Sequence, residues 1–517
     1  MIQIKNLCLY HKKDLRPLVE NLSFVLNDGD KAAVIGEEGN GKSTLLKLLY
    51  DSRLVEDYAE YTGEIIKNHA YCGYLPQELG REDREKTVYE YLSEEASFLD
   101  ADYSQLAAWA GKLGVSMDML YSAARMETLS GGEKVKIQMI RILSMNPNVF
   151  LLDEPSNDID METLRWLEDF INDCPFPVLF ISHDETLLER TANMILHMEQ
   201  LRRKTQSRCS VLRADYRTYV DRRLRGLERQ ELLAREERAE YEKQQERFRR
   251  IHDKVERDQN NISRQNPAGG RLLKKKMHAV KSMERRFERQ AENMTQMPET
   301  EEAIFFRFAQ GEGIPAGKWV ADFHLERLSA GNRTLAENIQ LQVRGPEKVC
   351  IVGKNGAGKT TLLRILAKEL LARKDIRAAY MPQNYEELLE LDRTPVEYLS
   401  RTFDREETSR IRTYLGSMKY TADEMDHQIR ELSGGQKAKL LLLKMSMEQR
   451  NVLILDEPTR NFSPLSGPVI RKLLSTFPGA IISVSHDRKY MEEVCTALYE
   501  LDGQGLHKVE VPLDNER

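Results

Sequence analysis

KAAVIGEEGNGKST, residues 31–44, is matched by KVCIVGKNGAGKTT, residues 348–361. Each stretch begins with an apolar run typical of a buried strand, continues into a glycine-rich loop and ends where an amphipathic segment begins. A loop of this kind between a strand and a helix lets successive backbone N–H groups point at phosphate oxygens. The chain therefore carries two phosphate-binding loops of the form GxxxxGK[ST].

Four further motifs recur in the same order in both halves. GYLPQ pairs with AYMPQ, LSGGE with LSGGQ, FLLDEP with LILDEP, and ISHD with VSHD. Ser130 and Ser433 are 303 residues apart, and so are Glu154 and Glu457. The chain is therefore a duplication, and strand-like runs that alternate with helical stretches predict an α/β fold with a parallel-rich sheet in each half.

One spacing differs between the halves. Lys42 and Gln77 are 35 residues apart, whereas Lys359 and Gln383 are 24 apart. The difference has the size of a loop, so we expect a longer loop in the first half.

The segment between the halves has a different composition, dominated by Arg, Glu, Gln and Lys. Apolar residues recur at seven-residue spacing from Val220 to Val255 and from Leu273 to Met294, which marks one seam on each of two helices. Pro267 to Gly270, Pro-Ala-Gly-Gly, predict a chain reversal and hence an antiparallel helical hairpin. We expect three parts: nucleotide-binding domains at residues 1–213 and 301–517 and a hairpin linker at residues 214–300.

The totals describe a soluble globular protein. Hydrophobic residues make up 41% and charged residues 31% of the 517 positions, and the net charge of −6 gives no global attraction to nucleic acid. The six cysteines have no metal-ligand spacing, which favours reduced thiols and a cytoplasmic location. The N-terminus lacks a signal-peptide pattern and no apolar run approaches the ~18 residues of a membrane span, so we expect no membrane domain in the chain.

The motifs predict ATP and Mg²⁺ as ligands. Lys42 and Lys359 would reach the β- and γ-phosphates, and each apolar run that ends in Asp-Glu-Pro would bring a carboxylate to the metal. Two surface-exposed acidic strand ends are the alternative, which five ordered motifs in duplicate outweigh. The expected metal-binding residues are Ser43, Gln77, Asp153, Thr360, Gln383 and Asp456.

Two residue types are expected to act on the terminal phosphate. Glu154 and Glu457 would polarise the attacking water in line with the γ-phosphate. His183 and His486 would contact the γ-phosphate from the far side, although a lone histidine is more often an ordinary core or surface residue. These four residues are the predicted catalytic set.

The ordered motifs resemble those of the ATP-binding cassette ATPases over almost the whole of both halves. The resemblance implies that Leu-Ser-Gly-Gly of each half caps the ATP held by the lysine of the other half, so that two ATP molecules lie between the halves and their hydrolysis releases the pair. It also implies an aromatic residue under adenine, for which Tyr10 is the candidate, whereas HLERLSAGNRT in the second half has none. The expected ATP-binding residues are Tyr10, Gly36, Gly39, Asn40, Gly41, Lys42, Ser43, Thr44, Gln77, Ser130, Gly131, Gly132, Gly353, Asn355, Gly356, Gly358, Lys359, Thr360, Thr361, Gln383, Ser433, Gly434 and Gly435.

The segments after the catalytic glutamates differ. The first half reads SNDID and the second reads TRNFSPLSGP. We therefore expect the two ATP sites to be unequal.

Two cassettes, no membrane span and a long charged linker together resemble the ABC-F family. NISRQNPAGGRLLKKKMHAVKSMERRFE and LDEPTRNFSPLSGPVIRK resemble its antibiotic-resistance branch of the Lsa/Vga type. The resemblance implies a monomer that docks at the exit site of the 70S ribosome. Its hairpin would reach past P-site tRNA toward rRNA of the peptidyl-transferase centre and dislodge antibiotics, with lincosamides, pleuromutilins and streptogramin A as the expected classes and phenicols or oxazolidinones as further candidates.

The linker itself has a local excess of positive charge. Residues 257–289 hold ten basic and three acidic residues. A solvated helical face is the alternative to phosphate contact, and the projecting tip favours contact with RNA. The residues expected to contact RNA are Arg264, Gln265, Asn266, Arg271, Lys274, Lys275, Lys276 and Lys281.

Other classes of ATPase fit less well. A general translation factor without a resistance role shares every feature above. The ATPase subunit of a drug exporter would explain the cassettes but not the long hairpin between them. A chromosome or repair ATPase would carry a coiled coil within one cassette or zinc-binding cysteines, which this sequence lacks.

Overall fold

Two compact units make up the protein in the computed structural model. One unit consists of residues 1–216 together with 301–517, and the other consists of residues 217–300. The residues that the structure describes are 1–157, 159–201, 206–260, 267–292, 294–295, 297–298, 313–331 and 333–509.

A six-stranded sheet lies at the centre of the N-terminal half, in the order β5-β6-β7-β3-β8-β9. Its first five strands are parallel, and β9 joins β8 antiparallel. Every residue of β3, β6 and β7 is buried, as expected for parallel strands covered on both faces. The strands of this half are β1 (Ile2–His11), β2 (Pro17–Leu26), β3 (Lys31–Ile35), β4 (Ala59–Lys67), β5 (Cys72–Leu75), β6 (Val149–Asp153), β7 (Val178–Ile181), β8 (Met194–Leu201) and β9 (Gln206–Leu212).

The C-terminal half repeats this sheet in the order β13-β14-β15-β12-β16-β17. The parallel-rich α/β architecture expected in each half is therefore confirmed. The strands of this half are β10 (Trp319–Ala330), β11 (Arg333–Arg344), β12 (Lys348–Val352), β13 (Ala378–Met381), β14 (Val452–Asp456), β15 (Ala480–Val484), β16 (Ala497–Asp502) and β17 (Gly505–Val509).

The additional residues of the first half do not form the longer loop expected from the spacing. They include β4, which pairs antiparallel with β1 in the three-stranded sheet β2-β1-β4, whereas the second half has the two-stranded sheet β10-β11. Ile65 and Ile66 lie opposite Ile4 and Gln3 in this pairing. The expectation of a loop was wrong because a length difference does not reveal whether the additional residues find a strand edge to pair with.

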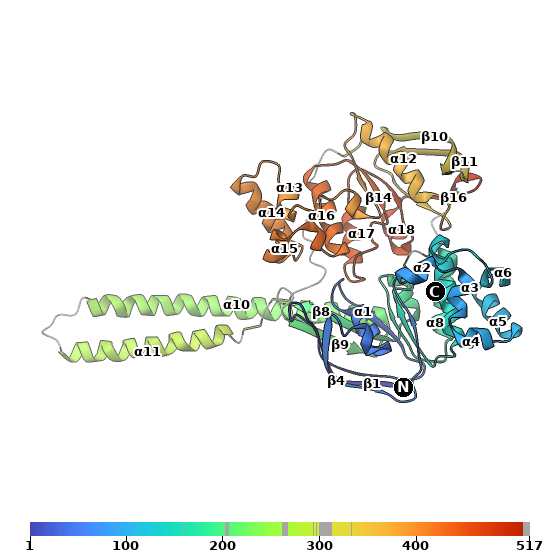
Figure 1. The fold of residues 1–517 in the computed structure, drawn as a ribbon. Coiled ribbons are helices and arrows are strands. Elements are labelled where there is room, and N and C mark those ends of the chain that lie inside the picture. The colour runs from blue at the N-terminus through green and yellow to red at the C-terminus, as the bar shows by residue number, and fades with distance from the viewer. Residues whose placement is uncertain are drawn as a thin grey trace. The chain divides into compact units, whose positions relative to one another are not determined.

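Short helices surround the two sheets, as Figure 1 shows for α1, α3 and α8 in the N-terminal half and α12, α16 and α17 in the C-terminal half. The helices of the N-terminal half are α1 (Lys42–Tyr50), η1 (Ser52–Leu54), α2 (Arg81–Glu85), α3 (Val88–Ser93), α4 (Ala96–Asp100), α5 (Tyr103–Leu113), α6 (Met117–Leu120), η2 (Met126–Thr128), α7 (Gly131–Ser144), α8 (Met161–Asp173) and α9 (Glu185–Thr191). Those of the C-terminal half are α12 (Lys359–Ala372), η3 (Tyr385–Glu387), α13 (Pro395–Leu399), α14 (Arg405–Ser417), α15 (Ala422–Asp426), η4 (Ile429–Glu431), α16 (Gly434–Met447), α17 (Gly467–Ser475) and α18 (Arg488–Val494).

The strand order brings the repeated motifs together. The phosphate-binding loops follow β3 and β12, the Asp-Glu pairs end β6 and β14, and the histidines follow β7 and β15. In each sheet these three strands are parallel neighbours, so their carboxyl ends lie at one edge. Ligands bind at this edge in open α/β sheets.

The second unit is an antiparallel helical hairpin made of α10 (Tyr216–Asn260) and α11 (Pro267–Glu292). The two helices lie side by side (Figure 1), and the ring of Phe287 packs edge-on against the rings of Tyr241 and Phe248 at 6.1 and 5.5 Å. The backbone N–H of Thr295 donates to Glu237 Oε2 at 2.7 Å. The two helices therefore run in opposite directions, which is the antiparallel arrangement expected from the two seven-residue seams.

The place of the reversal differs from the expectation. Pro267, Gly269 and Gly270 are the first residues of α11, so Pro-Ala-Gly-Gly begins the return helix. Proline suits this position because the first turn of a helix leaves its N–H groups without intrahelical partners. Residues 261–266, between α10 and α11 in the sequence, lie outside the described residues.

Among the helices that the structure describes, none has the length and apolar character needed to cross a bilayer.

Candidate functional site

Each phosphate-binding loop is held open by a glycine that no other residue could replace. Gly36 and Gly353 both have φ 144°. A Cβ on Gly36 would lie 2.2 Å from the carbonyl oxygen of Met198, and one on Gly353 would lie 2.5 Å from that of Leu501. The loops therefore lie directly against the backbone of β8 and β16, where a side chain on either glycine would clash.

The two loop lysines turn back onto their own loops. Lys42 Nζ donates to the carbonyls of Gly36 and Glu37 at 2.7 and 2.9 Å, and Lys359 Nζ donates to those of Gly353 and Lys354 at 2.8 and 2.9 Å. Burial lowers the pKa of Lys359. Each ammonium group thus lies against its own loop, where incoming phosphate oxygens could replace the carbonyl partners.

The expected metal-binding hydroxyl and carboxylate meet in both halves. Ser43 Oγ donates to Asp153 Oδ1 at 2.9 Å, and Thr360 Oγ1 donates to Asp456 Oδ1 at 3.4 Å. Burial raises the pKa of each aspartate to about 6, because removal from water disfavours the charged form of a carboxylate.

These residues fit Mg²⁺. Asp456 Oδ2 is buried and accepts no hydrogen bond from any residue that the structure describes. A hydroxyl beside such a carboxylate is the oxygen donor set that Mg²⁺ takes in nucleotide sites. When bound, Mg²⁺ would neutralise charge on the β- and γ-phosphates.

Glu154 and Glu457 share an unusual backbone conformation. Their φ angles are 50° and 49°, in the left-handed region that side chains other than glycine rarely adopt. The Glu154 N–H donates to the carbonyl of Ile181 at 3.1 Å, and the Glu457 N–H to that of Val484 at 2.9 Å. A neighbouring strand thus fixes the strained residue, as is common where a side chain must be aimed at a substrate.

The side chain of Glu154 has several partners. Gln77 Nε2 donates to its Oε2 at 2.9 Å, Asn157 Nδ2 donates to the same oxygen, and His183 Nε2 lies 3.4 Å from Oε1. Burial raises the pKa of Glu154, but the contacts with His183 and Asn157 and the charge of Lys42 outweigh burial and bring the pKa to about 2. Glu154 is therefore an ionised acceptor at neutral pH.

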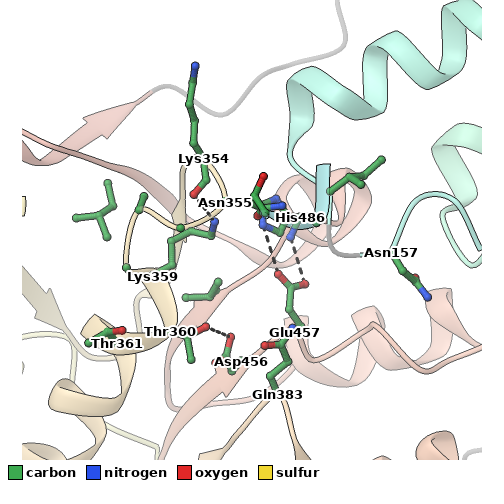
Figure 2. A pocket seen from close by; sticks show the side chains of 18 of the residues that line it. Asn157, Lys354, Asn355, Lys359, Thr360, Thr361, Gln383, Asp456, Glu457 and His486 are labelled. Atoms are coloured by element: carbon green, nitrogen blue, oxygen red, sulfur yellow. Dashed lines mark hydrogen bonds and ion pairs between the residues drawn. The ribbon is translucent and has the colours of Figure 1, made fainter. Parts of the chain in front are cut away.

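Glu457 lies in a different electrostatic environment. Burial and the neighbouring Asp456 raise its pKa to about 8, even though the backbone N–H of His486 donates to its Oε2 at 3.3 Å. His486 Nε2 is 3.8 Å from its Oε1, and burial with the nearby Lys359 lowers the histidine pKa to about 4. Figure 2 shows Glu457 and His486 in a close view together with Asp456 and Thr360.

The C-terminal loop opens onto a cavity of about 1280 Å³ that both halves line. Lys359, Asp456 and Glu457 contribute from the C-terminal half, and Ser130 and Gly131 of the signature motif contribute from the N-terminal half. We call this the Lys359 site. Its two faces come from opposite halves, as the family resemblance implied.

The opposite combination is closed. Gly435, in the signature motif of the C-terminal half, donates its backbone N–H to Glu38 Oε2 of the N-terminal loop at 2.8 Å. The space left between Ser433, Gly435 and this loop is only about 30 Å³. We call this second combination the Lys42 site.

His183 connects the halves directly. Its Nδ1–H donates to the carbonyl of Phe462, which follows Glu457 by five residues, at 2.7 Å. The same ring faces Glu154 through Nε2. His183 thus lies between its own catalytic glutamate and the other half.

Other expected residues contribute in ways that the motifs did not reveal. Asn40 is buried and donates through Nδ2 to the carbonyl of Met198 at 2.9 Å, so its side chain braces the loop against β8. A Cβ on Gly132 would lie 2.8 Å from Thr163 Oγ1, so this glycine permits packing within its own half. Gly356, Gly358, Thr361 and Gln383 line the Lys359 site together with Asn355.

The residue expected to stack on adenine is Tyr10, and other side chains lie beside the two phosphate-binding loops. Tyr10 lies in β1 opposite Pro17 and Glu60, and its role under adenine stays a prediction. Arg333 and Leu335 line the Lys359 site, and Arg16 of the N-terminal half donates to the carbonyl of Gly39 at 3.4 Å. No sequence motif marks these residues, since a guanidinium or an aliphatic side chain beside a loop forms no recognisable pattern.

Arg460 is a further lining residue of the Lys359 site and lies outside the repeated motifs. It occupies the position of Asn157 in the first half. The departure of TRNFSPLSGP from SNDID was the signal, but the sequence did not show that the arginine faces the cavity.

The linker lysines are accessible. Lys274, Lys275, Lys276 and Lys281 are all exposed on α11. Arg264, Gln265 and Asn266 lie outside the described residues, and of Arg271 only the helical backbone is described. Contact of these residues with RNA stays a prediction.

The chain is similar to a family model and to known proteins. The family model described as "ABC transporter" matches residues 19–157 and 336–460. The chain is 27% identical to "Probable ATP-binding protein YheS" of Escherichia coli (strain K12), over 94% of this chain and 77% of that protein. It is 26% identical to "ATP-binding cassette sub-family F member 3" of Homo sapiens, over 97% of this chain and 72% of that protein.

Solved structures share the fold. One is described as "Crystal structure of the complex of archaeal ribosomal stalk protein aP1 and archaeal ribosome recycling factor aABCE1", with a TM-score of 0.59 and 17% identity over 97% of this chain and 89% of that chain. Another, "Model of ribosome-bound archaeal Pelota and ABCE1", has a TM-score of 0.57 and 17% identity over 97% of this chain and 78% of that chain. At this identity the similarity establishes the tandem α/β fold alone.

Proposed function

The chain belongs to the ATP-binding cassette family, as an ATP-hydrolysing protein of the ABC-F type, and from this premise we propose that it binds the ribosome and moves its hairpin by closing its halves around ATP. The observation that carries this proposal is the pairing of each signature motif with the phosphate-binding loop of the other half. Nucleotide bound in such a site couples the two halves, and the hairpin is the segment that joins them.

Each ATP site would work through the residues described above. The loop N–H groups and Lys42 or Lys359 would hold the phosphates, and the signature serine and glycines of the opposite half would donate to the γ-phosphate only when the halves close. Glu154 or Glu457 would accept a proton from the attacking water. Glu154 is already ionised, whereas Glu457 must first lose its proton, which supports unequal turnover.

The hairpin supports RNA as the partner. Lys274, Lys275 and Lys276 are three consecutive exposed cations near the start of α11, and residues 257–289 have a net positive charge in an acidic protein. Neutralising phosphates releases counterions and so favours binding to RNA. The solved relative described as "ribosome-bound" supports the ribosome as the source of that RNA.

At finer detail, we propose docking at the exit site, with the hairpin reaching past P-site tRNA toward the peptidyl-transferase centre. There it would dislodge lincosamides, pleuromutilins or streptogramin A by disturbing tRNA and rRNA loops. The resemblance of the linker and of LDEPTRNFSPLSGPVIRK to the resistance branch supports this step.

The ribosome proposal is tested with the Glu154→Gln, Glu457→Gln double variant in a sucrose gradient. Because hydrolysis releases the closed pair, we expect ATP to trap the double variant on 70S ribosomes, while ADP does not. A Lys42→Ala, Lys359→Ala variant is the control that cannot close on ATP. Equal sedimentation of the trapped variant with and without ATP would contradict ribosome binding of the closed state.

The resistance step has its own measurement. Inhibitory concentrations of the five drug classes named above are compared in a susceptible host with the wild-type gene, the double glutamate variant and no gene. Higher values with the wild type alone support drug displacement. Unchanged values for every drug, combined with ATP-dependent trapping, would favour a general translation factor.

A further inference from the structure

The two phosphate-binding loops differ at the residues that face the opposite half. Glu37 and Glu38 occupy the positions of Lys354 and Asn355 in the second loop. The first loop thus places two carboxylates where the second has a cation and an amide. A phosphate-binding loop gains no obvious benefit from added negative charge, since its ligand is an anion.

Both carboxylates contact the signature helix of the other half. Glu38 Oε2 accepts the Gly435 N–H at 2.8 Å, and it lies 3.2 Å from the position that a Cβ on Gly434 would occupy. Glu37 Oε1 is 3.3 Å from Lys439 Nζ, whose side chain is 9% exposed. Two independent contacts therefore hold the loop against the first turns of α16.

The Glu38 carboxylate lies where a phosphate is expected. Gly435 is in the first turn of α16, where backbone N–H groups lack intrahelical partners and favour an anion. In the proposed function this N–H serves the γ-phosphate of the ATP held by Lys42. The gap that Glu38, Ser433 and Gly435 line is only about 30 Å³, so a terminal phosphate cannot reach the Gly435 N–H until the contact breaks.

The Lys359 site provides the comparison within the same chain. Asn355 lines a cavity of about 1280 Å³, and Ser130 and Gly131 line its other side. Figure 2 shows Asn355 beside Lys359 at this open site. The same pair of motifs is thus closed where the loop carries Glu38 and open where it carries Asn355.

We propose that Glu38 is a specificity-determining residue that substitutes for the terminal phosphate of ATP at the Lys42 site, so that nucleotide must displace its carboxylate from Gly435. This inference rests on the proposed function, in which Gly435 caps the ATP held by Lys42. Its consequence is an ordered loading of the two sites. The Lys359 site fills first, and the Lys42 site fills only at higher ATP concentration.

The test is a reciprocal exchange in the full-length protein. Mg²⁺ and a fluorescent ATP analogue are titrated into Glu38→Asn in a Lys359→Ala background, which reports the Lys42 site, and into Asn355→Glu in a Lys42→Ala background, which reports the Lys359 site. A hydrogen bond to a charged acceptor is stronger than one to a neutral acceptor, so Glu38→Asn is expected to increase affinity at the Lys42 site about fivefold. Asn355→Glu is expected to weaken the Lys359 site by a similar factor.

Three further variants make the result decisive. Glu38→Gln keeps the length of the side chain and should reproduce Glu38→Asn, while Glu64→Gln, a carboxylate change at an exposed surface pair with Lys5, should leave affinity within about twofold. Glu38→Asp keeps the charge and should not increase affinity. Thermal unfolding midpoints equal to wild type show that each variant is folded.

The outcomes separate this inference from the proposed function. Unchanged or weaker affinity in both Glu38→Asn and Glu38→Gln would overturn the role of Glu38 and leave the ATP sites intact. Loss of ATP binding in both lysine backgrounds without the exchange would overturn the nucleotide sites themselves, and the inference with them. Ribosome trapping is measured separately and does not enter the affinity comparison.

Discussion

At the scale of single residues, Glu154 and Glu457 show how two copies of one motif acquire different chemistry. Both end the same kind of buried strand and both have φ near 50°. Glu154 gains hydrogen bonds from Gln77 and Asn157, whereas burial and the negative charge of Asp456 raise the pKa of Glu457. The sequence predicted both glutamates from the motif alone, but their protonation depends on neighbours that only the fold assembles.

The raised pKa of Glu457 predicts that the stability of the protein depends on pH, and the Glu457→Gln variant should remove this dependence. Glu457 has a pKa of about 8 when folded and near 4.5 when unfolded, so between these values the folded state alone keeps the proton. Stability from this group is present below pH 4.5 and is lost as pH rises toward 8, at roughly 1.4 kcal/mol per pH unit. From pH 6 to pH 8 the nucleotide-free wild type should therefore lose roughly 2–3 kcal/mol relative to Glu457→Gln.

Glu154→Gln is the matched control for this measurement. The folded pKa of Glu154 is about 2, so its contribution is present above pH 4.5 and is lost only as pH falls toward 2. Denaturant unfolding of Glu154→Gln should therefore differ from wild type by a constant amount between pH 6 and pH 8. Parallel pH profiles for wild type and Glu457→Gln would contradict the raised pKa.

At the scale of elements, the sequence predicted two antiparallel helices but not the residue at which the second helix begins. Seven-residue spacing of apolar residues needs only the helix repeat, and the packing of Phe287 against Tyr241 and Phe248 agrees with that seam. Pro267 and the glycines were read as the reversal, but they begin α11 instead. Proline and glycine mark helix boundaries, and the sequence does not say on which side of the boundary they fall.

The exposed lysines of α11 provide a prediction for the hairpin as an RNA-binding element. Replacing Lys274, Lys275 and Lys276 by Glu should weaken ribosome association by about tenfold or more, because phosphate contacts are lost and repulsion is introduced. Basal ATPase activity should remain, since these residues lie in the compact unit that does not contain the nucleotide motifs. Sucrose-gradient co-sedimentation over a salt series and phosphate release measure the two properties.

Lys368→Glu with Lys374→Glu supplies the control, since both lysines are exposed cations on the C-terminal half. The control should sediment with ribosomes as the wild type does. Loss of basal ATPase activity in the hairpin variant would indicate misfolding, and unchanged ribosome association would refute the RNA contact.

At the scale of the whole molecule, buried ion pairs join the two halves. Arg471 Nη1 donates to Glu185 Oε1 at 2.6 Å, and both side chains are less than a tenth exposed. Arg488 pairs with Glu168 in the same way across 320 residues of sequence. These contacts connect α8 and α9 of the first half with α17 and α18 of the second.

Replacing Arg471 should lower the stability of the protein, because the ion pair with Glu185 joins the two halves. Arg471→Met leaves the buried Glu185 carboxylate with Lys489 at 3.4 Å as its remaining described cation, and should destabilise the protein by about 3 kcal/mol. Adding Glu185→Gln should recover much of the loss, because it removes the uncompensated charge. Denaturant unfolding followed by tryptophan fluorescence measures both variants.

Arg412→Met is the control for this comparison. Its pair with Asp426 is exposed, at 42% and 57% for the two side chains, so its loss should change stability by less than about 1 kcal/mol. An equal effect of Arg471→Met and Arg412→Met would contradict a structural role for the buried pair.

The sequence by itself determined the duplication, the α/β class, the order of the motifs and the helical hairpin. These features follow from local patterns: glycine spacing in a loop, continuous apolar runs in buried strands and seven-residue seams in helices. Only the tertiary structure decided that β4 completes a sheet, that Glu38 meets Gly435 and that Glu457 is buried beside Asp456. The β4 pairing and the Glu38–Gly435 contact join residues far apart in the chain, and the burial that shifts the pKa of Glu457 depends on the packing around it. A linear pattern contains neither.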